Sequence, residues 1–263
     1  MAESPSVVVV GAGITGLSCA AALRGRASVT VLDRVPVAGG VHGWRTAEAC
    51  DLVGRCGARL RLGETAIRWD GRELLALGQD GVTRLPARAL VIATGSRPLL
   101  RAELEVIGSR PAGVVSATVA CHLAENGLPV GRRPLVLGGG DWASASARAL
   151  LAAGARRLTV AVPGALLSDM PDDRRLDVRQ HDRVVAVHGR CRVTSVELAS
   201  GGLVECDALV LAHGLAPVRN VDGAVWDGHR TVYAQPIADP GSVEGARRAG
   251  ANAARAVTSL VDG

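Results

Sequence analysis

The chain has 263 residues, of which 48% are hydrophobic and 21% are charged, so it can bury a core in one large domain or two small ones. No run of 18 apolar residues is present and the first residues lack a secretory pattern, so we expect neither a membrane span nor export. With no Phe, one Tyr and a net charge of only +5 carried by scattered arginines, binding of nucleic acid is not expected.

The cysteine pattern bears on the cellular compartment and on metal binding. Six cysteines are present and none forms a C-x-x-C pair. Cys19 falls in a predicted helix and Cys206 enters a predicted strand, so both are interpreted as small core residues. The spacing of Cys50 and Cys56 is poorly suited to a metal. We therefore predict no metal site and a reducing, cytoplasmic location.

The first half of the chain opens with a strand, a glycine turn and a helix. An apolar strand at residues 7–10 enters Gly11-Ala-Gly13-Ile-Thr-Gly16, and the helix that follows ends near Gly25. A second strand at 29–32 places Asp33 at its C-terminal end, before a glycine-rich loop. The sequence then predicts short alternating strands from 59 to 85, with hairpin turns at Asp70-Gly71 and Asp80-Gly81, and a buried strand at 90–93.

The second half repeats this order. A helix at 117–125 precedes a second strand, glycine turn and helix at 135–154. The remaining predicted elements are strands at 158–162, several short strands between 184 and 205, strands at 209–212 and 231–234, and a helix at about 242–260 with Ala246, Ala249, Ala253 and Val257 on one face.

The two halves also share a longer phrase. Each glycine turn is followed by A-L-V-[IL]-A-x-G-x-x-P, at 89–98 and 208–217, with 84 and 76 residues between the corresponding glycines. A duplicated strand, turn and helix of this kind predicts an α/β fold. We expect two interleaved Rossmann-like dinucleotide-binding domains with parallel sheets and small antiparallel β insertions.

The first glycine turn has the residues that a dinucleotide requires. In such a turn the first glycine permits the tight bend, the second lets backbone approach a pyrophosphate, and the third lets helix and strand pack closely. The helix N-terminus offers N–H groups and a partial positive charge to the anion. Asp33 lies 22 residues after Gly11, where a carboxylate can accept hydrogen bonds from a ribose diol.

The second turn is less complete. Gly138, Gly140 and Ala143 satisfy the G-x-G-x-x-A pattern, but the following strand ends at Val162-Pro163-Gly164. This strand end has neither an acid for a ribose diol nor a basic cluster for a 2′-phosphate. Two interpretations stay open: the second unit binds a nicotinamide nucleotide, or it has lost or changed its ligand.

These motifs resemble the two-dinucleotide-binding flavoproteins, which include thioredoxin-reductase-like enzymes, over nearly the whole chain. The resemblance implies FAD at the first turn, NAD(P)H at the second, and domains of 1–107 with 206–263 and of 108–205. The cofactor contacts that we predict are Gly11, Gly13, Ile14, Thr15, Gly16, Asp33, Arg34, Gly40, Ala66, Ala93, Thr94, Gly95 and Asp239, together with Gly138, Gly140 and Asp141 at the second turn.

A closer resemblance lies in the segments 111–117, 122–123 and 127–134, which contain Gly113-Val-Val-Ser-Ala117 and Gly131-Arg-Arg133. They are similar to the FAD/NAD-type subunits of hydrogen cyanide synthase and of opine and proline dehydrogenases. In those dehydrogenases, the subunit works beside a second flavin subunit that oxidises an amine. The resemblance therefore implies a small-molecule substrate and either a partner subunit or a homodimer.

Three features depart from the family. No C-x-x-C is present for dithiol chemistry, and no H-R-R-x-x-x-R phosphate reader follows residues 158–162. The family's Gly-Asp pair, expected near 234–238, is absent, and Asp239 lies close to that place. These departures favour a flavoenzyme without a redox-active disulfide.

The favoured function is an FAD-dependent oxidoreductase that transfers hydride between a small molecule, such as an amine or amino acid, and the flavin. Two alternatives remain: a stand-alone NAD(P)H-dependent flavin reductase and a non-catalytic nucleotide-binding scaffold subunit. The catalytic residues are not identified by any motif. His42, in the glycine-rich loop, and His213, which takes the place of Thr94 in the repeat, are the candidates.

Overall fold

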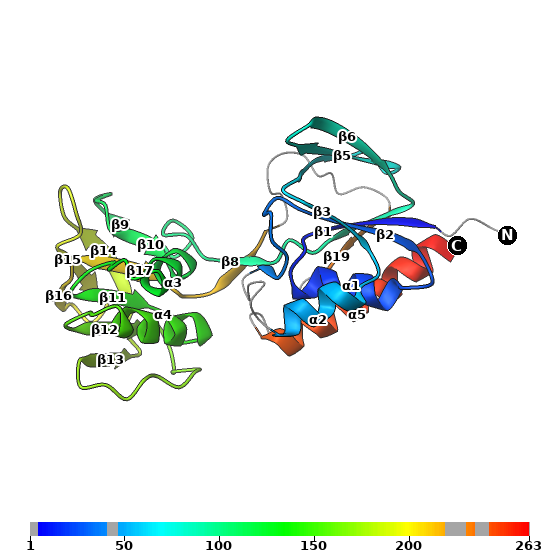
Figure 1. Cartoon of the computed structure of the whole chain (residues 1–263). Helices are drawn as coiled ribbons and strands as arrows, with labels where there is room; N and C mark the ends of the chain where they lie inside the picture. The colour runs from blue at the N-terminus through cyan, green and yellow to red at the C-terminus, as the bar shows by residue number, and fades with distance from the viewer. Residues whose placement is uncertain (1–4, 41–46, 219–229, 235–241, 263) are drawn as a thin grey trace. The chain divides into compact units, whose positions relative to one another are not determined.

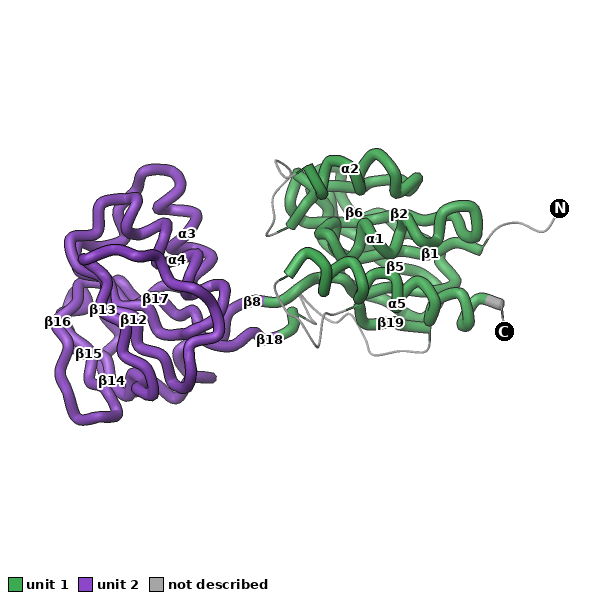
Figure 2. Tube along the Cα trace, turned by 90° about the horizontal axis from the view of Figure 1, so that it is seen from below, with its two compact units in different colours: residues 1–96, 217–263 green, residues 97–216 purple. Residues whose placement is uncertain are grey.

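The chain folds into two compact units, Met1–Ser96 with Pro217–Gly263, and Arg97–Ala216 (Figure 2). In this computed structural model, the described residues are 5–40, 47–218, 230–234 and 242–262 (Figure 1). The predicted α/β fold is confirmed, because each unit contains a parallel sheet, and antiparallel strand pairs form smaller sheets. The first unit is built from both ends of the chain, so the predicted interleaving is present.

The first unit is centred on a five-stranded parallel sheet. In sheet order its strands are β19 (Thr231–Tyr233), β7 (Ala89–Ile92), β1 (Ser6–Val10), β2 (Ser28–Asp33) and β3 (Arg59–Leu62). The central strands are buried on both faces, which explains their continuous runs of Val, Leu and Ile. The prediction for 59–62 was wrong in one respect: β3 extends the parallel sheet beside β2 and is not part of a hairpin.

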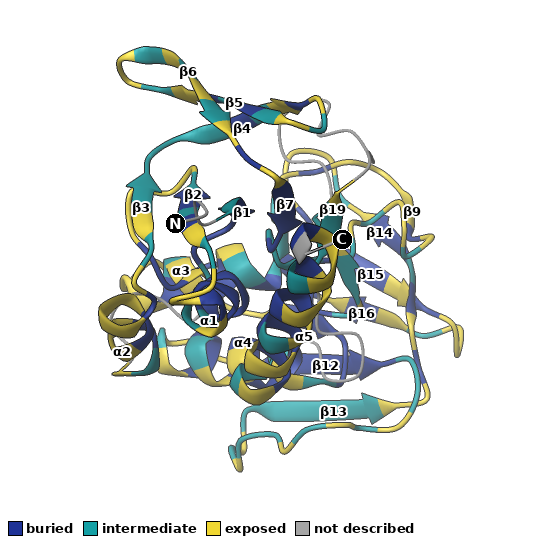
Figure 3. Cartoon of the chain, turned by 90° about the vertical axis from the view of Figure 1, so that its right-hand side faces the viewer, coloured by how far each residue is buried: buried dark blue, intermediate teal, exposed yellow. Residues whose placement is uncertain are grey.

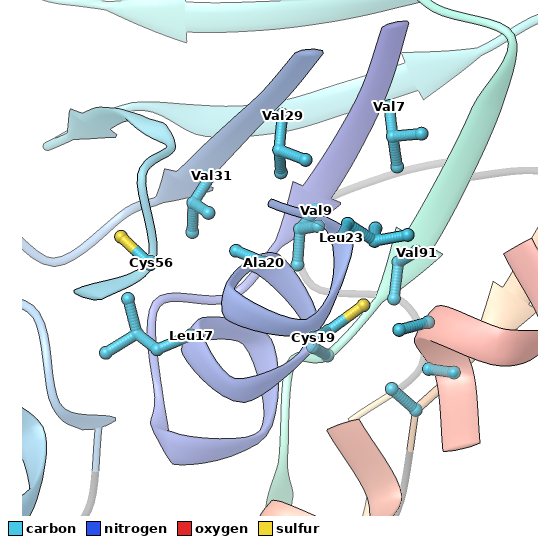
Figure 4. Packing of buried hydrophobic residues seen from close by; sticks show 14 of the residues in the cluster. Val7, Val9, Leu17, Cys19, Ala20, Leu23, Val29, Val31, Cys56 and Val91 are labelled. Carbon is cyan, nitrogen blue, oxygen red and sulfur yellow. The ribbon is translucent and has the colours of Figure 1, made fainter. Parts of the chain in front are cut away.

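Different layers cover the two faces of this sheet. Helices α1 (Ile14–Leu23), α2 (Ala47–Arg55) and α5 (Val243–Asp262) share a core with Val7, Val9 and Val31 (Figures 1 and 4). Strands β4 (Thr65–Trp69), β5 (Glu73–Gly78) and β6 (Gly81–Pro86) form an antiparallel sheet whose core includes Val8 and Val10. Alternate residues of β1 therefore serve two cores, and β6 itself is half-exposed (Figure 3).

Helices α1 and α5 approach each other closely at Gly250. A Cβ atom on this residue would lie 2.3 Å from the carbonyl oxygen of Thr15, a distance that no side chain accommodates. Cys19 lies in the same layer of the core, and burial raises the pKa of its thiol to about 12 (Figure 4). Its predicted role as a small core residue is therefore confirmed. The predicted alanine face of the last helix also packs inward.

The second unit has a parallel sheet of its own. In sheet order its strands are β10 (Val114–Ser116), β17 (Ala208–Leu211), β11 (Pro134–Leu137), β12 (Leu158–Val162) and β13 (Leu176–Gln180). Helices α3 (Ala117–Glu125) and α4 (Asp141–Ala152) pack on one face with Val136, Val160 and Val210. The sequence pattern did not predict β13, whose residues are only half-buried, nor α2 in the first unit.

A smaller sheet packs against the other face of this parallel sheet. Its order is β16 (Leu203–Glu205), β15 (Ser195–Leu198), β14 (Val184–His188) and β9 (Ile107–Gly108). Val184, Val187 and Leu198 from this sheet share a core with Leu135 and Leu209. The short strands predicted between 184 and 205 are these antiparallel strands.

The chain passes between the units at residues 96–97 and 216–217, whereas the sequence placed these crossings at 107–108 and 205–206. The connecting strands β8 (Ser96–Pro98) and β18 (Leu215–Pro217) pair with each other. Residues 206–216 belong to the second unit because they contain β17, which pairs with both β10 and β11. Among the helices of the described residues, none has the length and apolarity needed to cross a bilayer.

Candidate dinucleotide sites

Close backbone packing fixes the first glycine turn. Gly11 has φ +114, and a Cβ atom on it would lie 2.2 Å from the carbonyl oxygen of Ala93. A Cβ atom on Gly16 would lie 1.9 Å from the carbonyl oxygen of Gly11. Both positions therefore require glycine, as the motif predicts. The result is a turn whose backbone, free of side chains, lies directly before α1.

The N-terminus of α1 is open to an anion. Gly13 is the N-cap, no side chain caps the helix, and its first turn contains no acidic residue. Ile14 and Thr15 follow in the first turn with their side chains buried, and the first N–H groups of an α-helix have no partner within the helix. The positive end of the helix dipole and these N–H groups form the kind of site that holds a phosphate.

Asp33 lies at the C-terminal end of β2, beside the glycine turn. Its Oδ2 accepts a hydrogen bond from the backbone N–H of Ala12 at 2.7 Å, and its Oδ1 accepts one from Val35 at 2.9 Å. These bonds fix the half-exposed carboxylate, and each oxygen keeps a lone pair for a further donor. Two neighbouring hydroxyl groups of a ribose are suitable donors. Arg34 follows on an exposed loop.

The loop after β2 returns across the glycine turn. The N–H of Gly39 donates to the carbonyl oxygen of Ala12 at 2.8 Å, and Gly40 has φ +60. A Cβ atom on Gly40 would lie 3.1 Å from the Cα atom of Gly13. This second glycine pair keeps the space beside the turn free of side chains. Gly39 has φ +116, a conformation that favours glycine, so the backbone explains glycine at both positions.

The segment Ala93-Thr94-Gly95 completes the turn. The N–H of Ala93 donates to the carbonyl oxygen of Val10 at 2.8 Å, and the hydroxyl of Thr94 donates to the carbonyl oxygen of Val218. Thr94 thus ties together two segments that are distant in sequence. Ala66, in contrast, lies in the core beneath the sheet and is only 5% exposed. His42 and Asp239 lie outside the described residues.

The second glycine turn has the same backbone plan. The N–H of Gly138 donates to Ala161 at 2.9 Å, just as that of Gly11 donates to Leu32 at 2.7 Å. A Cβ atom on Gly138 would lie 2.5 Å from the carbonyl oxygen of Ala212. The two hydrogen bonds show that Val162 takes the place of Asp33. The contacts of the two glycines with Ala93 and Ala212 show that His213 takes the place of Thr94.

The side chains around this second turn differ from those around the first. Val162 is buried, and its Cγ1 methyl would lie 2.4 Å from a Cβ atom on Gly139. Leu167 takes the place of Gly39, because its N–H donates to the carbonyl oxygen of Gly139 at 2.8 Å. An apolar methyl group therefore stands where the first unit has the Asp33 carboxylate.

The segment 167–169 is bound to the first turns of α4. The hydroxyl of Ser168 donates to the Asp141 carboxylate, and that of Ser144 donates to the carbonyl oxygen of Asp169 at 2.5 Å. Arg148 donates to the same carbonyl oxygen at 3.2 Å. Asp141 stands in the first turn of α4, so a carboxylate already complements the helix dipole there. The predicted site residues Gly138, Gly140 and Asp141 are adjacent, but an acidic group for ribose is not among the described residues around them.

His213 belongs to the second turn. It follows β17 at the C-terminal end of the sheet, and its backbone nitrogen would lie 2.9 Å from a Cβ atom on Gly138. Its imidazole is half-exposed and forms no hydrogen bond or ion pair within the described part of the chain. Sequence reasoning did not identify Ser168 or Leu167 as neighbours of this turn, because only the fold brings them across it.

Three buried thiols are poorly suited to redox chemistry. Burial raises the pKa of Cys19 and of Cys206 to about 12, and it also raises the pKa of Cys121. Because the thiolate is the nucleophile, such protonated thiols react slowly. All six cysteines are free, and the exposed ones, Cys50 and Cys191, lie in different units. The described ranges contain no cluster of His, Cys, Asp or Glu that could hold a metal ion.

The comparisons with known proteins agree with this geometry. A family model for an NAD(P)-binding Rossmann-like domain matches residues 9–63, which include the first glycine turn, Asp33 and Gly39-Gly40. Residues 9–63 are thus similar to an NAD(P)-binding Rossmann-like domain, in agreement with the parallel strands and the glycine turn that the structure places there. No curated protein matches the chain.

Solved structures show the fold of the whole chain. A pyridine nucleotide-disulfide family oxidoreductase from Enterococcus faecalis V583 has a TM-score of 0.71 at 17% identity, with 97% of this chain and 69% of that one covered. For thioredoxin reductase from T. acidophilum the TM-score is 0.69 at 19% identity, with 99% of this chain and 100% of that one covered. For L-proline dehydrogenase from P. horikoshii the TM-score is 0.65 at 17% identity, with 98% of this chain and 55% of that one covered. The chain therefore has the two-unit fold of these oxidoreductases. It spans less than two thirds of the proline dehydrogenase and of two other matched chains.

Proposed function

We propose that this chain is a flavin-dependent oxidoreductase that holds FAD at the glycine turn of the first unit. The observation that supports the proposal is the geometry of that turn, where added Cβ atoms on Gly11 and Gly16 would overlap backbone atoms. The turn, the uncapped helix and the Asp33 carboxylate fit a dinucleotide. Because FAD carries both a pyrophosphate and an adenosine ribose, its adenosine half matches these groups.

Each part of the turn has a separate task. The backbone N–H groups at the start of α1 bind the pyrophosphate, and Asp33 accepts hydrogen bonds from the ribose hydroxyls. Gly40, which has no side chain, leaves space for the ligand beside the turn. When bound, the flavin supplies hydride transfer, so the protein needs only to position it and the substrate.

The proposed substrate is a small amine or amino acid, and the proposed assembly includes a second, partner subunit. This proposal rests on the resemblance of 111–117 and 127–134 to subunits of amine-oxidising dehydrogenases. The fold shared with the L-proline dehydrogenase is consistent with it. A route through a redox-active disulfide is disfavoured because burial raises the pKa of three thiols.

One observation supports a second candidate, a nucleotide-binding scaffold subunit without redox chemistry. Val162 replaces the ribose-binding acid in the second unit, so that unit lacks a group expected of an NAD(P)H site. A stand-alone NAD(P)H-dependent flavin reductase needs both sites, and Val162 therefore weighs against that alternative.

The test begins with the visible spectrum of the purified chain after incubation with FAD and desalting. We expect flavin absorbance, and release of FAD on denaturation, identified by mass. Anaerobic mixing with L-proline and other small amino acids or amines then reports reduction by loss of that absorbance. A chain that keeps FAD and is reduced by none of them supports the scaffold. A chain that retains no flavin refutes the cofactor assignment.

A further inference from the structure

Three Arg-Arg pairs lie at one edge of the second unit. The pairs at 132–133, 156–157 and 174–175 directly precede β11, β12 and β13, which are neighbours in the sheet (Figure 1). The strands are parallel, and their register pairs Leu135 with Thr159 and Leu158 with Leu176. Continued backwards, this register aligns the three pairs side by side.

Backbone hydrogen bonds confirm this alignment. The N–H of Arg156 donates to the carbonyl oxygen of Arg132 at 2.8 Å, and the N–H of Leu158 donates to that of Arg175 at 2.9 Å. Since parallel strands begin at the same edge of a sheet, pairs separated by 18 to 24 residues in sequence converge in space. We call the six residues Arg132, Arg133, Arg156, Arg157, Arg174 and Arg175 the arginine edge.

Within each pair, the second arginine lies within ion-pair distance of a carboxylate of the same chain. The closest contacts are 2.8 Å for Arg133 with Glu205, 3.9 Å for Arg157 with Asp177, and 2.6 Å for Arg175 with Asp173. Arg175 also donates to the carbonyl oxygens of Leu151 and Ala155 at the end of α4. Arg175 is thus held in place by the fold, whereas the exposed Arg157 has only a distant partner, which also binds Arg179 at 3.2 Å.

The first arginine of each pair is different. Arg132, Arg156 and Arg174 are exposed, and their side chains form no hydrogen bond or ion pair within the described residues. Arg174 acts only at longer range, where its charge adds to the effect of Arg175 in lowering the pKa of Asp173. Three guanidinium groups on adjacent strands therefore remain available to an anion.

A groove runs along this edge. Its volume is about 730 Å³. Its lining contains two of the three available arginines, Arg156 and Arg174, beside the paired Arg157, Arg175 and Asp177, while Arg132 lies outside it. The surplus of positive charge favours a negatively charged occupant. The groove lies where β12 begins, at the opposite end of that strand from Val162, so an occupant leaves the second glycine turn accessible.

We propose that the arginine edge docks an acidic segment of a partner protein. Neighbouring strands lie about 4.8 Å apart, so the three available guanidinium groups span roughly 10 Å, a length that suits a few carboxylates. Nucleic-acid affinity comes largely from many contacts to phosphates, of which three arginines supply few, and the groove lining contains no aromatic residue to stack a base. A second copy of the chain, with its net charge of +5, is a poor complement. The proposal goes beyond the cofactor function and does not depend on it.

The test measures binding of a fluorescein-labelled oligoglutamate peptide to the full chain by fluorescence anisotropy. Oligothymidylate of equal length and tripolyphosphate serve as competing probes. The test variant is R132E/R156E/R174E, and the matched control is R26E/R72E/R88E, which changes three exposed arginines of the first unit and alters the net charge equally. We expect the test variant to lose about tenfold or more in peptide affinity and the control less than about threefold.

Two outcomes would overturn the proposal. One is an equal loss in the test variant and the control, which would mean that only net charge matters. The other is binding of oligothymidylate or tripolyphosphate as tightly as the peptide, which would assign the edge to nucleic acid or to small anions. Circular dichroism checks that each variant is folded. If R132E/R156E/R174E is unfolded, R132Q/R156Q/R174Q replaces it, with the same direction of change expected.

Discussion

The two glycine turns share a backbone and differ in the side chains around it. In both, the first glycine packs against a carbonyl oxygen of the strand-end segment, and the loop after the second strand crosses the turn. The corresponding residues are Asp33 and Val162, Gly39 and Leu167, and Ile14 and Asp141. Packing of strand and helix therefore gives the same turn even where the side chains around it differ.

The largest expected effect comes from the third position of each turn, Gly16 and Ala143. Gly16→Ala places a Cβ atom 1.9 Å from the carbonyl oxygen of Gly11, so helix and strand must separate. We expect it to lower the free energy of unfolding by about 1–3 kcal/mol, or more if the backbone cannot shift, and to abolish FAD retention. The reciprocal Ala143→Gly should cost only about 1 kcal/mol, from helix propensity. Urea unfolding measures the free energy of unfolding of both variants. Equal losses would show that helix and strand pack equally closely at the two turns.

The next effect separates recognition from packing. Asp33→Ala removes the carboxylate that accepts from Ala12 and Val35, and we expect roughly 10- to 100-fold weaker FAD binding. Val162→Ala removes buried methyl groups at the corresponding place in the second unit. It should reduce stability by about 1–3 kcal/mol and leave FAD affinity unchanged. Fluorescence titration with FAD and urea unfolding test the pair. Weaker FAD binding in Val162→Ala would contradict the assignment of FAD to the first turn.

A smaller effect is expected at the segment 167–169. Ser168→Ala removes the hydrogen bond to Asp141, with a cost of about 1 kcal/mol. Amide hydrogen exchange should accelerate locally around residues 167–169, while the Gly11 turn keeps its protection. Ser259→Ala, at an exposed position of α5, is the control. Unchanged exchange at 167–169 would mean that Leu167 and Asp169 alone hold the segment.

The smallest expected effect is a loss of stability of the second unit at low pH. Arg97 holds the pKa of Glu103 at about 2, and Arg175 does the same for Asp173, with both pairs in the second unit. A lowered folded-state pKa gives stability that is present above the unfolded pKa and lost as pH falls through the folded one. The second unit should therefore weaken between about pH 4.5 and pH 2. Urea midpoints across this range should fall less steeply in Glu103→Gln and Asp173→Asn, and unchanged slopes would show that solvent screening cancels both pairs.

Local signals made most of the fold predictable. The strand–turn–helix units and the helix at 117–125 were recognised from apolar runs and glycines that act within a few residues. β3 and β13 were missed or misassigned because half-buried edge strands carry a weak pattern, and their place depends on a neighbour elsewhere in the sequence. Of the candidate site, Gly11, Gly16 and Asp33 were found by motif, whereas Ser168 gives no motif signal.

The amino-acid sequence by itself indicated the duplicated Rossmann plan and the position of Asp33 at the end of the second strand, because both follow from short-range periodicity and spacing. From the sequence, the arginines were interpreted as scattered, and along the linear chain the three Arg-Arg pairs are indeed far apart. Their convergence follows from the parallel register of β11, β12 and β13, which aligns segments 18 and 24 residues apart. Such register is set by long-range pairing and core packing. The arginine edge, and the segment 167–169 that crosses the second glycine turn, therefore form only when the sheet is assembled.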